Sequence, residues 1–257
     1  MDKGSVAGTV IGIGGILGGL FLEGGKIGQV LQPTAAMIVF GGTLGAVLLQ
    51  FPLGSVLAAV RQLGNVISEP SHDGDAKISE LVDFAIRARR EGIVSLDARL
   101  SAVEDQFLKK SLMLAIDGTE PQELRKTMEL DLDASAEQEE NIPKVFESAG
   151  GFSPTIGIIG AVLGLIQVMQ HLQNIEEVGR GIAVAFVATI YGVGSANLFL
   201  LPVAGKLRMR IREAQILREM TLEGVISILE GMNPRMLETK LRGFLHETGE
   251  ATAKHTQ

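Results

Sequence analysis

The 257-residue sequence has no cysteine, no tryptophan and only one tyrosine. The absence of cysteine excludes a disulfide framework, a thiolate metal site and a cysteine nucleophile. The histidines are isolated and share no helical spacing, so the sequence predicts no metal site; they are His72, His171, His246 and His255. No Ser/His/Asp constellation, glycine-rich phosphate loop or pair of catalytic carboxylates is present. We therefore predict no catalytic site, and the formal net charge of −7 argues weakly against nucleic acid as a partner.

Charge is also missing from four long stretches, although it is dense between them. These stretches lie between Lys3 and Glu23, between Lys26 and Arg61, between Glu147 and His171, and between Arg180 and Lys206. A helix needs about 20 mainly apolar residues to cross a bilayer. We place transmembrane spans near residues 5–22, 34–52, 151–170 and 182–203. No convincing cleavage site follows the first stretch, so we interpret it as a retained span and not as a signal peptide.

Basic residues predict the orientation of the spans, because they concentrate on the cytoplasmic side. Four basic residues directly follow the fourth span: Lys206, Arg208, Arg210 and Arg212. In contrast, each short connector has one basic residue, Lys26 in the first and Arg180 in the second. The region between spans two and three is also rich in basic residues. Both termini and this middle region are therefore expected in the cytoplasm, with both short connectors outside.

The sequence predicts an all-α integral membrane protein with four transmembrane helices in two hairpins. The expected parts are a transmembrane hairpin (1–53), a cytoplasmic helical domain (54–147), a second transmembrane hairpin (148–205) and a cytoplasmic helical tail (206–257). Between the hairpins, helices are expected from just after Asp73–Asp75 to Arg90, over Ser95–Leu100, over Glu104–Ile116, and from Pro121 straight into span three. In the tail, helices are expected over Lys206–Met232 and from Pro234 to Leu241, with Gly243 as a stop and disorder after Glu247.

Spans three and four carry small residues four positions apart, which let helices approach closely in lipid. These are Gly160 with Gly164, and Ala188 with Gly192 and Ala196. Gly42 and Ala46 in span two have the same spacing, as do Gly14 and Gly18 in span one, where ordinary bundle packing is the preferred interpretation.

Prolines and polar side chains also stand out in spans three and four. Pro154 and Pro202 would free the carbonyls four residues earlier, at Gly150 and Leu198. Such carbonyls are tolerated in a bilayer where protein, water or an ion provides a hydrogen-bond or ligand partner. Two interpretations follow: the prolines belong to an ion path, or each only shapes a helix end. Polar groups in these spans could likewise line a wet path or join helices; they include Ser153, Thr155, Thr189, Tyr191, Ser195 and Asn197.

No span contains a charged residue or a histidine in its interior. A charge near the middle of the bilayer costs roughly 2.5–3.5 kcal/mol on insertion scales, so such groups usually mark ion paths. If this protein conducts protons, the carboxylate that carries them must therefore come from another subunit.

Four segments together resemble the MotA family of flagellar stators, within the wider MotA/TolQ/ExbB group. They are SPTIGIIGAVLGLI (residues 153–166), AVAFVATIYG (183–192), PVAGKL (202–207) and RREGIVSLD (89–97). The resemblance implies a homopentamer in the bacterial inner membrane around a dimer of a MotB-like partner that carries the ion-binding Asp. It also implies that spans three and four line the pore. Pro154 and Pro202 match the family's two functional prolines.

The resemblance further implies that the cytoplasmic domain contacts a rotor switch-complex protein of the FliG type. Arg89 and Asp97 match the family's charged pair at this contact, and Arg90 and Glu91 lie beside them. Some relatives have further acids after the position of Asp97, where this chain has Ala98-Arg99. Pairing with the rotor could then use other charges, such as Glu104 or Asp105. The alternative interpretation of Arg89, Arg90 and Glu91 is a solvated helix face.

Protons are favoured over sodium as the transported ion, and no cofactor is expected. Ala161 occupies the position where sodium-driven relatives carry a threonine, whose hydroxyl could replace a water ligand of a hard cation. Gln32 stands where that branch often has an acid, whereas Thr189 is shared by both branches. The alternatives are a sodium-driven stator, an energising subunit of the ExbB/TolQ type, and a channel or scaffold that works alone.

Overall fold

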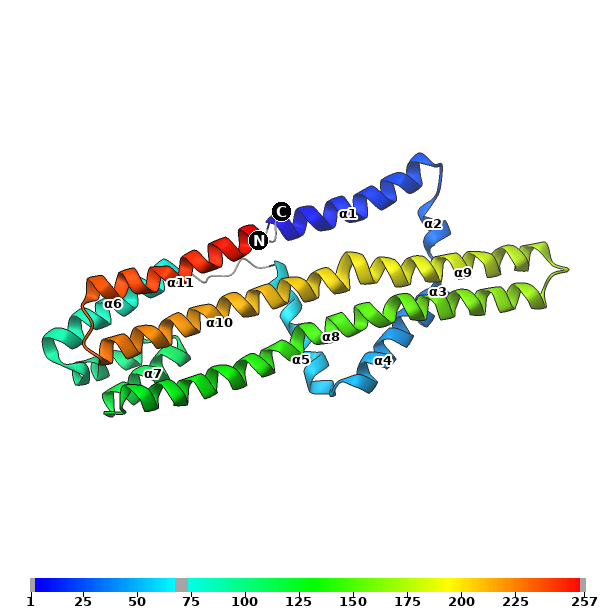
Figure 1. Cartoon of the computed structure of the whole chain (residues 1–257). Coiled ribbons are helices and arrows are strands. Elements are labelled where there is room, and N and C mark those ends of the chain that lie inside the picture. Colours follow the sequence, from blue (N-terminus) through cyan, green and yellow to red (C-terminus); the bar gives the residue numbers. More distant parts are fainter. Residues whose placement is uncertain (1–2, 68–73, 255–257) are drawn as a thin grey trace. The chain divides into compact units, whose positions relative to one another are not determined.

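The computed structural model describes residues 3–67 and 74–254, and almost all of them are helical (Figure 1). The chain divides into two compact units. We call residues 1–70 and 140–208 the membrane unit, and residues 71–139 and 209–257 the helical unit. The prediction of an all-α protein with four apolar helices is confirmed.

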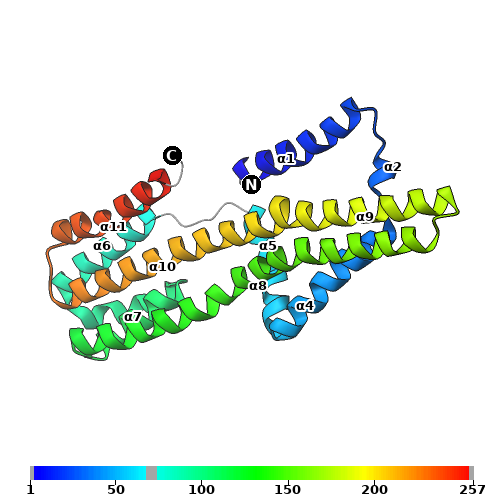
Figure 2. The same cartoon turned by 45° about the vertical axis from the view of Figure 1, so that its right-hand side comes forward.

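Among the described residues, four helices are long and apolar enough to cross a membrane, and each lies wholly or partly in the membrane unit. They are Gly4–Leu22, Pro33–Gln50, and parts of Pro121–Gln170 and Ile175–Leu229. The elements of this unit are α1 (Lys3–Leu22), α2 (Ile27–Val30), α3 (Pro33–Ala36), η1 (Met37–Gly41), α4 (Gly42–Gln50), α5 (Leu53–Ile67), the second part of α8 (Pro121–Gln170), α9 (Ile175–Ser195), η3 (Ala196–Leu200) and the start of α10 (Leu201–Leu229). Figures 1 and 2 show α8 and α9 side by side along the membrane unit.

The described residues of the helical unit form one apolar core. Its elements are α6 (Gly74–Glu91), η2 (Ile93–Ala102), α7 (Gln106–Ile116), the first part of α8, the remainder of α10, and α11 (Pro234–Lys254). The fully buried side chains come from every one of these elements and include Leu81, Leu96, Leu108, Leu124, Met220 and Leu237. The helices α6 and α11 lie side by side in both views (Figure 2).

Local signals explain where the helices of this unit begin and end. The Asp105 carboxylate accepts hydrogen bonds from the backbone N–H groups of Phe107 and Leu108, at 2.9 and 3.2 Å, and so caps α7. Gly92 and Gly118 follow α6 and α7 with φ of 85° and 83°, a backbone conformation that only glycine adopts without strain. Asp73, near which the first of these helices was expected, lies outside the described residues.

The structure differs from the expected tail in two respects. The helix expected from Lys206 begins at Leu201, directly after span four. The final helix does not stop near Leu241–Gly243 but continues to Lys254. Phe244 and Leu245 pack against the core of the helical unit, so tertiary contacts outweigh the low helix propensity of Gly243.

Two other features are absent from the sequence-based prediction. The helix α5 follows span two and packs Val56, Ala59 and Val66 into a second apolar cluster. The segments η1 and η3 are π-helical turns within spans two and four. Such turns insert one residue into a helix and occur frequently at functional sites.

Candidate ion pathway and rotor-contact surface

Spans three and four approach each other along a line of small residues that we call the glycine seam. It consists of Gly157, Gly160 and Gly164 on α8 and of Gly181, Ala185, Ala188 and Gly192 on α9. A Cβ on Gly192 would lie 2.6 Å from the Ser153 carbonyl oxygen, and one on Gly164 would lie 2.7 Å from the Gly181 carbonyl oxygen. The main chains are therefore in direct contact, and no larger side chain fits between them.

Next to the seam, one buried hydrogen bond joins the two spans. The hydroxyls of Ser153 and Ser195 are 2.7 Å apart, and Ser153 is only 1% exposed. The Ser195 hydroxyl also lies 3.2 Å from the Gly192 carbonyl oxygen and can donate to it. Pro154 lies beside the same glycine, because a Cβ on Gly192 would come within 3.2 Å of the Pro154 Cα. A serine pair, a proline and a close main-chain contact thus meet at one level.

The segments that carry the two predicted prolines pack against each other. Gly150, four residues before Pro154, packs against Leu201, the neighbour of Pro202; a Cβ on Gly150 would lie 2.7 Å from the Leu201 Cδ2. Pro202 lies two residues after the end of the turn η3 at Leu200, and the Leu201 N–H bonds back five residues to the Ala196 carbonyl. Pro154 is half-buried and Pro202 is exposed. Each proline removes one backbone hydrogen bond from its helix, and helices usually bend where such a bond is missing.

Three more residues predicted for the ion path make no hydrogen bond to the described residues of the facing span. Thr189 is half-buried and donates its hydroxyl to the Ala185 carbonyl at 3.2 Å, while Ala161 presents only a half-buried methyl group. Thr155 is exposed and donates to the Phe152 carbonyl at 2.8 Å. These hydroxyls therefore bond within their own helices, and their oxygens keep a free acceptor site.

Tyr191 lies in a different setting from the other predicted path residues. Its hydroxyl donates to the Val30 carbonyl at 2.6 Å and accepts from the Gln32 N–H at 3.3 Å. Its ring stacks on Phe40 of η1, with centroids 5.7 Å apart. Tyr191 thus fastens span four to the connector that precedes span two.

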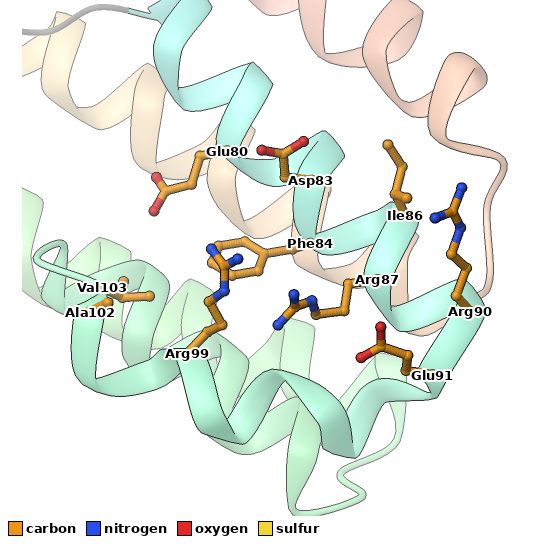
Figure 3. Close-up of a pocket in the computed structure, with 10 residues that line it drawn as sticks. All are labelled: Glu80, Asp83, Phe84, Ile86, Arg87, Arg90, Glu91, Arg99, Ala102 and Val103. Atoms are coloured by element: carbon orange, nitrogen blue, oxygen red, sulfur yellow. The ribbon is translucent and has the colours of Figure 1, made fainter.

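The predicted rotor-contacting residues lie at the end of α6 and on η2 in the helical unit. Arg89, Arg90, Glu91 and Asp97 are all exposed. Figure 3 shows a pocket of about 340 Å³ whose lining includes Arg90 and Glu91, but neither Arg89 nor Asp97. Arg87 on α6 and Arg99 on η2 also point into it, from opposite sides (Figure 3). The structure thus adds Arg87 and Arg99, which sequence reasoning missed, to this charged surface.

The two further acids that were considered for the rotor contact differ in availability. Asp105 caps α7 and forms an ion pair with Lys77 at 2.9 Å. Burial by itself would raise the pKa of Asp105, but the hydrogen bonds from Lys77 and from the α7 backbone outweigh it and lower the pKa. Glu104 is exposed and forms no ion pair with any residue that the structure describes. Glu104 therefore remains free for a partner, whereas Asp105 is already used.

Comparison with known proteins places this arrangement in a family. Residues 99–220 match the model of the MotA/TolQ/ExbB proton channel family, and residues 6–89 match the model of the motility protein A N-terminal region. Motility protein A of Bacillus subtilis (strain 168) is 34% identical over 249 residues, which cover 95% of this chain and 91% of that protein.

Solved structures agree with the sequence relatives. A chain of C. jejuni MotAB superposes with a TM-score of 0.90 at 31% identity, covering 95% of this chain and 96% of that chain. A chain of the flagellar MotAB stator complex from Bacillus subtilis gives a TM-score of 0.88 at 31% identity, covering 100% of both chains. The chain therefore belongs to the motility protein A family, within the MotA/TolQ/ExbB proton channel family.

Proposed function

We propose that this chain is the A-type subunit of a flagellar motor stator, which couples ion flow across the inner membrane to torque on the rotor. The observation that carries this proposal is the end-to-end likeness to chains of MotAB stator complexes. The relatives named motility protein A do not favour the alternative of an ExbB/TolQ-type energising subunit. The likeness to these complexes supports several copies of this chain around a MotB-like partner, and we propose five as their number.

The proposed mechanism divides the work between the subunits. The described spans hold no carboxylate, so the partner supplies the ion-binding Asp within the membrane. Protonation of that Asp removes a charge from a low-dielectric site and changes which neighbours it prefers. The seam, the Ser153–Ser195 pair and the two proline segments are the parts of this chain that respond. Both termini and the helical unit then face the cytoplasm, as the distribution of basic residues suggests.

We propose protons as the transported ion, because Ala161 offers no oxygen ligand. Swimming speed against external sodium at fixed membrane potential tests this, in cells whose only stators contain this chain and its partner. We expect no dependence on sodium. Ala161→Thr serves as the comparison variant, since it restores the hydroxyl of the sodium-driven branch. Speed that rises with sodium in the unmodified protein would overturn the choice of ion but not the stator function.

The exposed charges of α6 and η2 are proposed to contact a FliG-like rotor protein. Exposed ion pairs contribute only about 0–1 kcal/mol each, which suits contacts that form and break at every step. Arg89→Glu should reduce stall torque, measured with tethered beads, and leave ion flux through the complex unchanged. Arg235→Glu is the matched control, because Arg235 is an exposed arginine of the same unit on α11. A loss of ion flux in Arg89→Glu would place that residue in the pathway instead.

A further inference from the structure

A cavity in the membrane unit borders one end of the glycine seam, at Gly164 and Gly181, and does not include the proline segments. It has a volume of about 480 Å³ and lies between α3, η1, α8 and α9, beside the turn that joins α8 to α9. Its wall is mainly apolar and includes Ile38, Leu163, Ile166 and Val184, all from helices that cross the membrane. Water finds few hydrogen-bond partners on an apolar wall of this kind, whereas a hydrocarbon chain can pack against it.

The rim of the cavity carries one cation and one anion on α9. Arg180 forms no ion pair with any residue that the structure describes. Glu177 lies three positions earlier on the same helix; its carboxylate accepts a hydrogen bond from Asn174 Nδ2 at 3.3 Å and lies 3.2 Å from His171 Nε2. Glu177 is thus fixed in place by the turn, while the Arg180 guanidinium has its donors available.

We propose that this cavity binds one phospholipid of the phosphatidylethanolamine class. An acyl chain lies along the apolar wall, the phosphate bonds to the Arg180 guanidinium, and the primary ammonium bonds to the Glu177 carboxylate. Both contacts are charge-assisted hydrogen bonds, and a guanidinium matches phosphate geometry well. Phosphatidylglycerol has the phosphate but no cation for Glu177, and the quaternary ammonium of phosphatidylcholine has no N–H to donate. In the proposed orientation, the lipid belongs to the outer leaflet.

The inference rests on the membrane location of the spans and not on ion coupling, so it is tested by lipid binding. The complex of this chain with its MotB-like partner is delipidated in detergent and titrated with each of the three lipids. Bound lipid is counted by native mass spectrometry. We expect the unmodified complex to bind phosphatidylethanolamine about tenfold more tightly than phosphatidylglycerol, as the loss of one charge-assisted contact predicts.

Two variants and a control assign the binding to this cavity. Arg180→Gln removes the phosphate contact and should weaken phosphatidylethanolamine binding about tenfold. Val184→Phe fills the apolar part and should weaken all three lipids. Lys26→Gln removes a cation from the other short connector, outside the cavity, and should bind as the unmodified protein does. Equal binding of phosphatidylethanolamine and phosphatidylglycerol, or unchanged binding in both cavity variants, would overturn the proposal.

A photo-crosslinking residue at Leu163 identifies the occupant directly in membranes. Adducts with the mass of phosphatidylethanolamine support the proposal. This result does not depend on whether the protein tolerates the larger side chain of Val184→Phe. Adducts with a second copy of this chain, or with the partner, would show that protein fills the cavity and would overturn it. Ion flux and motility are measured separately, so failure of the lipid proposal leaves the stator function intact.

Discussion

At the scale of single residues, Glu223 on α10 links three helices of the helical unit, because two cations from other helices share its carboxylate. Arg125 Nη2 on α8 lies 2.7 Å from Glu223 Oε2, and Lys240 Nζ on α11 bonds to Oε1. Burial would raise the pKa of Glu223, but the hydrogen bonds from Lys240 and Arg125 outweigh it, and the pKa is lowered. A carboxyl group with a lowered folded-state pKa stabilises the fold above its ordinary pKa. That stabilisation is lost as the pH falls through the folded-state value.

We expect Glu223→Gln to cost about 1 kcal/mol at pH 7, because it weakens the pairing of two cations that are themselves partly exposed to solvent. The difference from the unmodified protein should shrink as the pH falls below about 4.5, the ordinary pKa of glutamate. Chemical unfolding of the purified complex at several pH values measures both effects. The control is Glu219→Gln, one turn away on the same helix, where the glutamate is exposed. A pH-independent difference would show that charge pairing is not the cause.

Some residue-scale features could be inferred from the sequence and others could not. The segments around Pro154, Pro202 and Arg89 stand out by residue type and position. The cap formed by Asp105 has a local signal, an acidic residue directly before a helical pattern, which would have shown that this acid is occupied. Tyr191 has no such signal, because its partners Val30 and Gln32 are about 160 positions away in the chain. Pro143 was also overlooked, a buried proline in the interior of α8.

At the scale of elements, the α8–α9 pair depends on main-chain contact. The spacing of Gly160 with Gly164 and of Ala188 with Gly192 indicated close packing, and each of these residues contacts the facing span in the structure. In contrast, Gly14 and Gly18 of α1 have open space where a Cβ would stand, and no residue of Gly4–Leu22 is buried. The same spacing thus has different outcomes, because a sequence pattern does not say which helix lies opposite. The π-helical turns η1 and η3 likewise have no sequence signal that we can identify.

Gly192→Ala should destabilise the complex and impair motility, whereas Gly194→Ala should do neither. A methyl group on Gly192 would meet only backbone atoms, at 2.6–3.2 Å, and such overpacking costs about 1–3 kcal/mol. A methyl group on Gly194 would meet nothing within 4 Å, and alanine is the better helix former. Thermal unfolding of the purified complex and swimming assays measure the two effects. Equal behaviour of the two variants would mean that the seam is looser than described.

At the scale of the whole molecule, the segregation of charge along the chain made the fold predictable. Four uncharged stretches predicted four spans, and the structure and relatives confirm them. The extent of α11 was not predictable, because the contacts of Phe244 and Leu245 with the core come from distant parts of the chain.

This chain reconstituted alone in liposomes should not conduct protons above the background leak. Its spans contain no titratable carboxylate, so a proton has no carrier within the membrane. Co-reconstitution with the MotB-like partner should restore flux, measured with a pH-sensitive dye under an imposed potential. Replacing the membrane Asp of the partner by Asn is the control and should abolish it. Flux through the lone chain would support an independent channel and contradict the shared mechanism.

The glycine seam has a consequence for how spans three and four can move. Glycine and alanine have no side-chain rotamers to lose or exchange, so small shifts along the seam need no repacking of interlocked side chains. A seam of leucines would instead hold the helices in discrete registers, each separated by a barrier of rotamer changes. Small displacements of span three against span four therefore have a low entropic cost, and they could recur many times each second. The glycines responsible are Gly157, Gly160, Gly164 and Gly192.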